Sequence, residues 1–522
     1  MQTQRLFLLN LVTDIVPYTT IRAMPVTLED LPPELYSAIL EQLPPNWCIV
    51  QQTLLSLTRA IPCSPVPIYR LFEHVRIRHP EQAVQLHRRL RKAALEASWV
   101  RDFALETWVA DADVVVNLLD ILPQISVLSL FIGPNFSPEH LQEIFEKPRS
   151  TFSNLVLRFR PYVQKATYYQ FLKGAYYDTT LHALSRWPTS NIPTISIVQE
   201  PLDPNVARGQ HFAQPLVFFR LDPLTALVCS GFAQSITCFR LRVPSRQVAR
   251  FLCSSPAAAP GIELLDLSTC SVAMSDTETI LAHFSKMKHL ILDGCSIMRG
   301  EPREGEWIAV GKACALGPVK RAKEREKKLV AWLGTNALSS SEPDRLQAMG
   351  AQHTGRRIRP GRRGLATAAI SLRASPPRDV PTPVVSNVTN TKIRIMPSLP
   401  ALLSFSTNSP TICSDRYGSI RMDFMQGWTE GLAQLTAIRM RLRQSWRNNV
   451  RVVRFGDILG SEEGLDDLVD VEDEEEFDVS QSEGNSFGNA PALCLAGEEG
   501  ESHTEHCGHT ESKRVWKDTN VL

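Results

Sequence analysis

The sequence predicts an α/β fold in which short parallel strands alternate with helical return segments, repeated along the chain as a solenoid. Three observations predict it: a spaced series of apolar triplets, two nine-residue motifs of one pattern, and a helix-start signal between those motifs. Each triplet has large apolar residues at relative positions 1, 4 and 6. The nine triplets are Phe72/Val75/Ile77, Val100/Phe103/Leu105, Ile125/Leu128/Leu130, Phe152/Leu155/Leu157, Ile192/Ile195/Ile197, Leu216/Phe219/Leu221, Ile236/Phe239/Leu241, Ile262/Leu265/Leu267 and Met287/Leu290/Leu292.

The spacing of the triplets indicates a repeat. Their final residues lie 28, 25, 27, 40, 24, 20, 26 and 25 positions apart. A period near 25 is typical of repeats that supply one strand and one return segment each. Stacked neighbours bury the apolar face that a single repeat cannot bury, and the open side becomes a binding surface. The alternative is a set of unrelated buried strands in an ordinary globular fold.

The last two repeats are the most regular. Ile262–Cys270 and Met287–Cys295 both read LxxLxLxxC when Ile and Met are accepted at the first position. This pattern resembles a leucine-rich repeat, which implies that the sixth residue faces the core and that the Cys lies where the chain leaves the strand. Between the motifs, Ser275 and Glu278 fit a capping box at a helix start. The long 40-residue step is expected to hold an aromatic insertion that forms a packed helix, with Tyr168, Tyr169, Phe171, Leu172, Tyr176 and Tyr177.

A second signal precedes the repeats. Leu31-Pro32-Pro33-Glu34 is followed by apolar residues at 35, 39, 40 and 43. Proline suits the first helical turn, and the 35/39/43 stripe is one face of an amphipathic helix. The run resembles the start of an F-box, the helical module that docks on the Skp adaptor of cullin-based ubiquitin ligases. The alternative is an ordinary helix N-terminus.

The F-box resemblance implies a set of adaptor-binding residues: Leu31, Pro32, Leu35, Ile39 and Leu43. Leu31 and Pro32 would insert into the adaptor, while Leu35 and Ile39 would share adaptor contact with the core of the module itself. The stretch after Leu43 is shorter and more polar than in many F-boxes, so the closing helices are the weak part of the match. Residues 61–67 are expected to form a stiff linker.

The expected organisation follows from these signals and from composition. We expect a disordered extension at 1–23, an F-box-like module at 24–66, a leucine-rich-repeat-like solenoid at 67–333, a disordered linker at 334–420, an amphipathic helix plus strand at 421–456, and an acidic disordered tail at 457–522. The linker is rich in Ser, Thr, Pro and Arg, a composition that buries too little apolar surface to offset its ordering entropy. The tail begins with eleven acids and no base in residues 462–478.

The helix expected within 421–456 carries an apolar stripe about 35 Å long: Phe424, Trp428, Leu432, Leu435, Ile438, Leu442 and Trp446. Packing against the solenoid is the favoured interpretation, since an uncovered stripe of this width would be an exposed apolar patch. The alternative is contact with an acidic partner through the arginines near its end.

Whole-chain properties exclude some classes. The net charge is +1, and the eleven Cys show no paired framework, which favours free thiols in a reducing compartment. No apolar run approaches the roughly 18 residues needed to cross a bilayer, so we expect no membrane and a cytoplasmic or nuclear location.

Several catalytic or metal-binding motifs fail on inspection. Residues 484–488 spell G-x-S-x-G without a flanking strand and helix, and Gly305 to Lys312 imitates a phosphate loop with the wrong spacing. His503, His506, Cys507 and His509 form a cluster without a second ligand pair or a foldable frame, so no structural zinc is expected. We expect neither an active site nor a cofactor.

The resulting functional prediction is a substrate-recognition adaptor. The module at 24–66 would hold the Skp adaptor and, through it, a cullin ligase, while the solenoid would hold a protein substrate. Side chains flanking the last core residue of each strand would face that substrate, and an acidic or phosphorylated segment would suit them: Arg76, Phe131, Arg158, Arg220, Arg240 and Arg242. Two alternatives stay open. One is a repeat scaffold without a ligase, and the other, less favoured, is nucleic-acid association through the Arg clusters at 356–363 and 439–454.

Overall fold

The computed structural model describes most of the chain outside a few long segments. The described residues are 28, 31–43, 47–62, 66–160, 178–188, 191–201, 220–295, 305–339, 393–408, 412, 414–446, 448, 450–455, 468–470, 490–498, 500, 503 and 506–516. Four predictions fall outside these residues: the extension at 1–23, the aromatic insertion helix, the Arg cluster at 356–363 and the failed G-x-S-x-G segment. The chain folds as two compact units, Met1–Ser129 and Leu130–Leu522.

The fold class is α/β, as predicted. Ten strands form a parallel sheet in the order β1-β2-β3-β4-β5-β6-β7-β8-β10-β13, so strands follow chain order with helices between them. A second sheet has three strands in the order β12-β11-β9. The boundary between the two units lies within β3 (Val127–Ile132).

The first unit begins with two helices and continues as alternating helices and strands. Its elements are α1 (Pro33–Glu41), α2 (Trp47–Ala60), α3 (Tyr69–Glu73), β1 (His74–Ile77), α4 (Pro80–Leu90), α5 (Ala94–Trp99), β2 (Asp102–Leu105) and α6 (Ala112–Asp120). Val75 of β1 pairs with Phe103 of β2 in a parallel ladder. Asp111 caps α6 by accepting hydrogen bonds from the backbone N–H groups of Asp113 and Val114.

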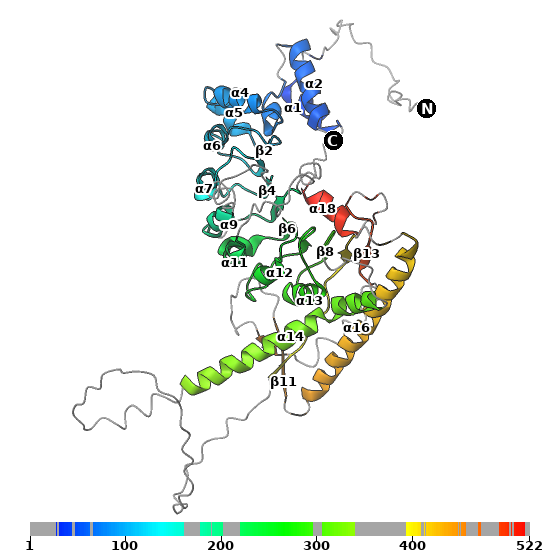
Figure 1. Cartoon of the computed structure of the whole chain (residues 1–522). Coiled ribbons are helices and arrows are strands. Elements are labelled where there is room, and N and C mark those ends of the chain that lie inside the picture. Colours follow the sequence, from blue (N-terminus) through cyan, green and yellow to red (C-terminus); the bar gives the residue numbers. More distant parts are fainter. Residues whose placement is uncertain are drawn as a thin grey trace, which may run out of the picture. The chain divides into compact units, whose positions relative to one another are not determined.

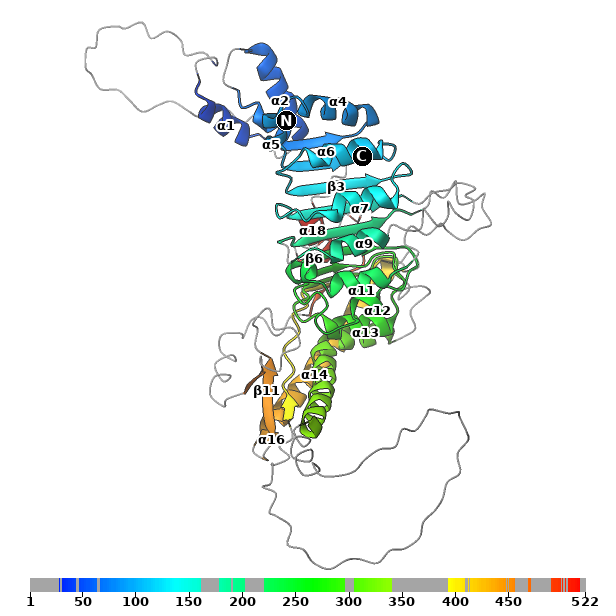
Figure 2. The ribbon, with the colours of Figure 1, turned by 90° about the vertical axis from the view of Figure 1, so that its left-hand side faces the viewer.

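The second unit continues the alternation. Its elements up to β8 are α7 (Pro138–Glu146), β4 (Asn154–Phe159), α9 (Asp178–Ser185), β5 (Thr194–Gln199), α11 (Asp222–Val228), the 3-10 helix η2 (Gly231–Ser235), β6 (Cys238–Arg242), α12 (Ala249–Leu252), β7 (Leu264–Asp266), α13 (Met274–His283) and β8 (His289–Ile291). Helices α7, α9 and α11 follow one another along one face of the sheet (Figure 2).

The later elements of this unit follow β8. They are α14 (Glu306–Ser339), β9 (Ile393–Ile395), β10 (Ser404–Ser406), the 3-10 helix η4 (Ser414–Arg416), α16 (Tyr417–Trp446), β11 (Arg451–Phe455), β12 (Leu468–Asp470), β13 (Ala492–Cys494) and α18 (Gly508–Trp516).

Eight of the nine apolar triplets coincide with strands β1 to β8, and their residues at positions 4 and 6 are buried except for Val75, which is half-buried. Phe239 and Leu241 of β6 are buried, and so are Leu265 and Leu267 at β7. One triplet was predicted wrongly. Leu216 and Phe219 lie outside the described residues, Leu221 directly precedes α11, and β5 pairs directly with β6, so no strand is inserted between them.

The Cys residues of the two LxxLxLxxC motifs lie where the chain leaves the strand. The Cys270 thiol donates to the Leu241 carbonyl at 3.3 Å, and the Cys295 thiol donates to the Leu267 carbonyl at 3.1 Å. Each bond therefore joins one repeat to the preceding one. Burial raises the pKa of Cys270 to about 12, which keeps the thiol protonated and able to donate.

The helix between these motifs starts earlier than predicted. Helix α13 begins at Met274 with Ala273 as its N-cap, and the Asp276 carboxylate accepts a hydrogen bond from the Ala273 backbone N–H at 3.0 Å. Ser275 therefore lies in the first turn, and Glu278 pairs with Lys320 at 3.6 Å. The Asp276 side chain, not the predicted Ser275–Glu278 pair, therefore satisfies a free backbone N–H at this helix start.

Two predicted disordered regions contain strands of the main sheet. Strand β10 follows β8 in the sheet with Phe405 opposite Leu290, and β13 follows β10 with Leu493 opposite Phe405. The linker prediction for 334–420 is thus wrong for 393–408, for 334–339 at the end of α14, and for 414–420, which hold η4 and the start of α16. The tail prediction for 457–522 is wrong for β12, β13 and α18. The remaining parts of both regions lie largely outside the described residues.

Helices α14 and α16 pack against each other, which confirms the packing interpretation for Phe424, Trp428 and Leu435 of the aromatic stripe. Phe424 and Trp428 are buried, and the Phe424 ring stacks on Phe405 of β10 with centroids 6.1 Å apart. Glycines allow the close approach: a Cβ at Gly311 would meet the Phe424 carbonyl oxygen, and one at Gly427 would meet the Ile308 carbonyl oxygen. The segment that imitates a phosphate loop is therefore a helix-packing surface.

Candidate functional site

Helix α1 starts where the Leu-Pro-Pro-Glu sequence predicts. Pro32 is the N-cap in an extended conformation, and Pro33 takes the first helical position, where its missing N–H removes no helical hydrogen bond. Glu34 lies in the first turn, where a carboxylate is favoured by the helix dipole. Tyr36 fixes the preceding chain because its hydroxyl donates to the Leu28 carbonyl.

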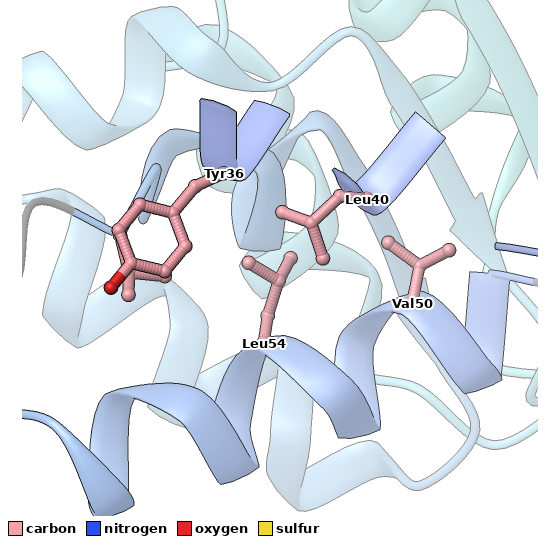
Figure 3. Close-up of a cluster of buried hydrophobic side chains, with 5 residues drawn as sticks. Tyr36, Leu40, Val50 and Leu54 are labelled. Atoms are coloured by element: carbon pink, nitrogen blue, oxygen red, sulfur yellow. The ribbon is translucent and has the colours of Figure 1, made fainter. Parts of the chain in front are cut away.

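The N-terminal module has a small hydrophobic core of its own. Tyr36 and Leu40 of α1 pack against Val50 and Leu54 of α2, as Figure 3 shows, and Val66 completes the cluster. Sequence reasoning missed this core because it followed the 35/39/43 stripe. The 36/40 pair has the same helical spacing and would have identified it.

The predicted stripe faces solvent along most of its length. Leu35 is 47% exposed and Ile39 is 49% exposed, while Tyr36 and Leu40 are 1% and 2% exposed. The implied sharing of Leu35 and Ile39 with the core of the module is therefore wrong. At 100° per residue, the exposed pair points roughly 100° away from the buried pair around the helix.

The other predicted adaptor residues differ in exposure. Pro32 is exposed at the start of α1, whereas Leu31 and Leu43 are partly buried and pack against the module core. Pro32, Leu35 and Ile39 are thus free to contact a partner. Leu31 and Leu43 contribute to the stability of the module itself.

The second half of the module is more regular than its sequence suggested. Helix α2 spans the polar stretch 47–60, and Gln51 donates to the His74 carbonyl of β1 at 2.9 Å. Arg70 of α3 pairs with Glu41 of α1 at 2.8 Å. These contacts tie the module to the first strand. The predicted stiff linker is buried at both ends: Ile61 and Val66 are buried, and residues 63–65 lie outside the described residues.

An open groove of about 420 Å³ lies beside α1 on another side of the helix. Its lining residues come only from the first unit: Pro33, Glu34, Ser37, Val66, Pro67, Ile68, Tyr69 and Trp99. It adds apolar surface to that offered by Leu35 and Ile39.

The predicted substrate-binding residues do not share one environment. Arg76 lies 3.7 Å from Glu106 in the first unit. In the second unit, Arg158 pairs with Glu200 at 2.5 Å and lies over the Phe131 ring at 4.8 Å. Arg220 is exposed and lies next to α11, outside any strand of the described part.

Arg240 and Arg242 are covered, contrary to prediction. Helix α18 lies on the sheet face opposite α7, α9 and α11 and contacts β5, β8 and β10 (Figure 1). Arg240 is 5% exposed, its guanidinium lies 4.2 Å from the centre of the Trp516 ring, and it donates to Ser512 at 2.7 Å. It therefore binds a segment of its own chain.

Asp266 is the centre of this covered cluster. Its Oδ2 accepts from Arg240 at 3.0 Å and from Arg242 at 2.6 Å, and its Oδ1 accepts from Ser268 at 2.7 Å. Arg242 also reaches Glu498 at 2.7 Å. Burial alone would raise the pKa of Asp266, but the attraction of the two arginines outweighs it and holds that pKa well below the usual range.

Four potential metal ligands converge at the edge of the same face. They are Cys494, His503, Cys507 and His509, whose donor atoms all lie within 4.8 Å of one another. The histidine-rich cluster was not expected to bind zinc, because the sequence shows no frame and no second ligand pair around it. Both reasons are wrong: β13 supplies Cys494 and α18 holds His509. His506 is exposed and is not part of the group.

Comparison with protein-family models, curated proteins and solved structures gives no significant match to this chain. Among the described residues, no helix is both long and apolar enough to cross a membrane. Function is therefore inferred from the geometry above and from the sequence resemblances.

Proposed function

We propose that this chain is the substrate-recognition subunit of a Skp–cullin–F-box ubiquitin ligase. The α1–α2 module binds the Skp adaptor, and the parallel sheet of the repeats presents a protein substrate. The chain positions the substrate and so raises its local concentration near the ubiquitin-carrying subunit. Other proteins of the complex perform the chemistry.

One observation carries the proposal: α1 has a buried apolar face and a separate exposed one. Tyr36 and Leu40 belong to the core of the module, and Leu35 and Ile39 lie outside that core. Apolar residues spaced i and i+4 on an exposed helix are the anchors by which a helix binds a hydrophobic partner surface. Pro32 adds a third exposed contact at the position that the F-box resemblance assigns to the adaptor.

The repeats after the module support the second half of the proposal. The order of module first and repeats second matches F-box proteins with leucine-rich repeats, and the thiol-to-carbonyl bonds of Cys270 and Cys295 suit the leucine-rich-repeat resemblance. The substrate surface must exclude Arg240, because α18 covers it. In the second unit, the Phe131–Arg158 pair remains as a contact for an acidic or phosphorylated segment, which would compete with Glu200 for the Arg158 guanidinium.

The adaptor half can be tested by capture of purified Skp adaptor on the full-length chain. Leu35→Glu with Ile39→Glu should abolish capture, since two charges would be buried in an apolar interface. Leu95→Glu is the matched control, because Leu95 is 68% exposed in the same unit, on α5. Circular dichroism should show that all variants are folded.

Two outcomes would reject the adaptor assignment. Equal capture by the double variant and by the wild type would exclude this face as the docking surface. Absence of any capture by the folded wild-type chain would leave the repeat scaffold without a ligase as the better hypothesis.

A further inference from the structure

We propose that Cys494, His503, Cys507 and His509 form a tetrahedral zinc site. The Cys494 Sγ lies 3.6 Å from His503 Nδ1 and 3.4 Å from His509 Nδ1. The Cys507 Sγ lies 3.6 Å and 3.4 Å from the same two nitrogens. Zinc bonds of about 2.3 Å to sulfur and about 2.0 Å to nitrogen place the two atom types about 3.5 Å apart in a tetrahedron. All four sulfur–nitrogen separations therefore match a shared central ion.

The donor set selects the metal. Two thiolates and two imidazoles in tetrahedral geometry suit zinc, whereas magnesium and calcium require oxygen ligands. With all four positions supplied by protein, the site is closed, which is the pattern of a structural zinc rather than a catalytic one.

The surroundings orient the ligands in the way metal sites do. His509 Nε2 lies 2.7 Å from the Asp293 carboxylate, so its Nδ1 is free to face the metal. The His509 backbone N–H donates to the Cys507 sulfur at 3.4 Å. The carboxylate raises the basicity of the imidazole, and the N–H stabilises a thiolate.

The four ligands lie where α18 meets the last strand of the main sheet. Strand register aligns Arg240 with Asp266, Asp266 with Ile291, Ile291 with Ser406, and Ser406 with Cys494. Helix α18 crosses this row, and a Cβ at Gly508 would lie 3.0 Å from Ser406 Oγ and 3.1 Å from Ile291 Cγ1. A metal bound to Cys494 of the last strand and to His509 of α18 would therefore fasten the helix onto the sheet.

The zinc site does not depend on binding to a Skp adaptor. It would hold α18 on the sheet equally in a scaffold protein without a ligase. Its consequence for function is that the zinc keeps α18 over Arg240 and so limits the face that a substrate can reach.

The test is the metal content of the full-length chain, purified without added metal under reducing conditions. Elemental analysis should find one zinc ion per chain. Cys494→Ser and His509→Ala should each lose most of the zinc. His506→Ala changes an exposed histidine next to the site, and Cys229→Ser changes an exposed thiol elsewhere in the chain, so both variants should keep the zinc. Replacement by Co²⁺ should give the visible absorption of a tetrahedral thiolate complex.

A second readout covers the case in which a variant fails to fold. Removing the metal from the wild type with a chelator should raise amide hydrogen exchange in 508–516, and added Zn²⁺ should restore protection. A folded wild-type chain without zinc that also fails to take up Zn²⁺ or Co²⁺ would overturn the proposal. So would zinc retained in both ligand variants, or a Cys494–Cys507 disulfide found by mass spectrometry in the reduced preparation.

Discussion

Asp266 shows how a buried acid is held in its charged form. Its carboxylate has no contact with solvent, yet two arginines and Ser268 satisfy it. Because its pKa when folded lies below the unfolded value of about 3.9, ionised Asp266 contributes stability that is fully present above pH of about 4. That contribution is lost as the pH falls toward the folded pKa.

Neutralising this carboxylate should therefore destabilise the second unit. Asp266→Asn leaves the buried Arg240 with only the longer pair to Glu498 at 3.6 Å, and we expect a loss of about 3 kcal/mol in the free energy of unfolding at neutral pH. In the acid range, the free energy of unfolding should also change less with pH in this variant than in the wild type. Urea unfolding at several pH values measures both effects.

The control is Glu278→Gln, which removes an exposed pair with Lys320 and should cost well under 1 kcal/mol. Equal stability of Asp266→Asn and the wild type at neutral pH would show that the cluster contributes nothing.

Single residues also mark a limit of the sequence analysis. Alternation along β6 correctly predicted that Arg240 points away from the core, since Phe239 and Leu241 point toward it. It could not predict that the side chain is covered, because Ser512, which accepts its hydrogen bond, lies 272 positions later in the chain. Cys494 could not be predicted as a ligand either, because strand pairing and not sequence spacing brings it close to the histidines.

At the scale of elements, the crossing of α14 and α16 gives a prediction about glycine. Gly311→Ala gains helix propensity of up to about 1 kcal/mol, but its Cβ would overlap the Phe424 carbonyl oxygen and lie 2.9 Å from the Trp428 backbone nitrogen. We expect a net destabilisation of about 1–3 kcal/mol, as is usual for overpacking. Amide exchange in α16 should accelerate.

Gly418 in α16 provides the matched control, because nothing lies within 4 Å of the position of its Cβ. Gly418→Ala should leave stability unchanged or raise it slightly. If both alanine variants behave alike, the close approach of the two helices is not what Gly311 permits.

Elements with a strong local period were predictable. Eight strands coincide with the 1/4/6 triplets because alternation reports burial on one face. Two later strands carry only two of the three large apolar residues of this pattern, at Leu402/Phe405/Thr407 and Ala490/Leu493/Leu495. Long polar segments precede both strands, so composition outweighed pattern. Their three-residue length also left little signal.

At the scale of the whole molecule, the C-terminal third completes the sheet begun by the earlier chain. A chain that ends at residue 391 lacks β10, β13 and α16, so it should expose the edge of β8 and the side of α14 that meets α16 at Gly311 and Ala315. We expect such a chain to aggregate, because unpaired edges and exposed apolar faces promote association. Size-exclusion chromatography measures this.

The control keeps every described element of the chain. Replacing residues 345–388 by a Gly/Ser segment of equal length should preserve solubility and the thermal midpoint, in line with the compositional prediction for that stretch. A soluble, monomeric chain ending at 391 would contradict the completion of the sheet by the C-terminal strands.

The account rests on α1 as a docking helix with a core side and a partner side. Calorimetric titration of the purified full-length chain with purified Skp adaptor tests this most directly, with Leu35→Ala and Ile39→Ala beside the wild type. We predict a one-to-one complex, and a loss of at least about 2 kcal/mol, or about 30-fold in Kd, for each substitution at a hot spot. No heat of binding from the folded wild-type chain, or an unchanged Kd in both variants, would contradict the account.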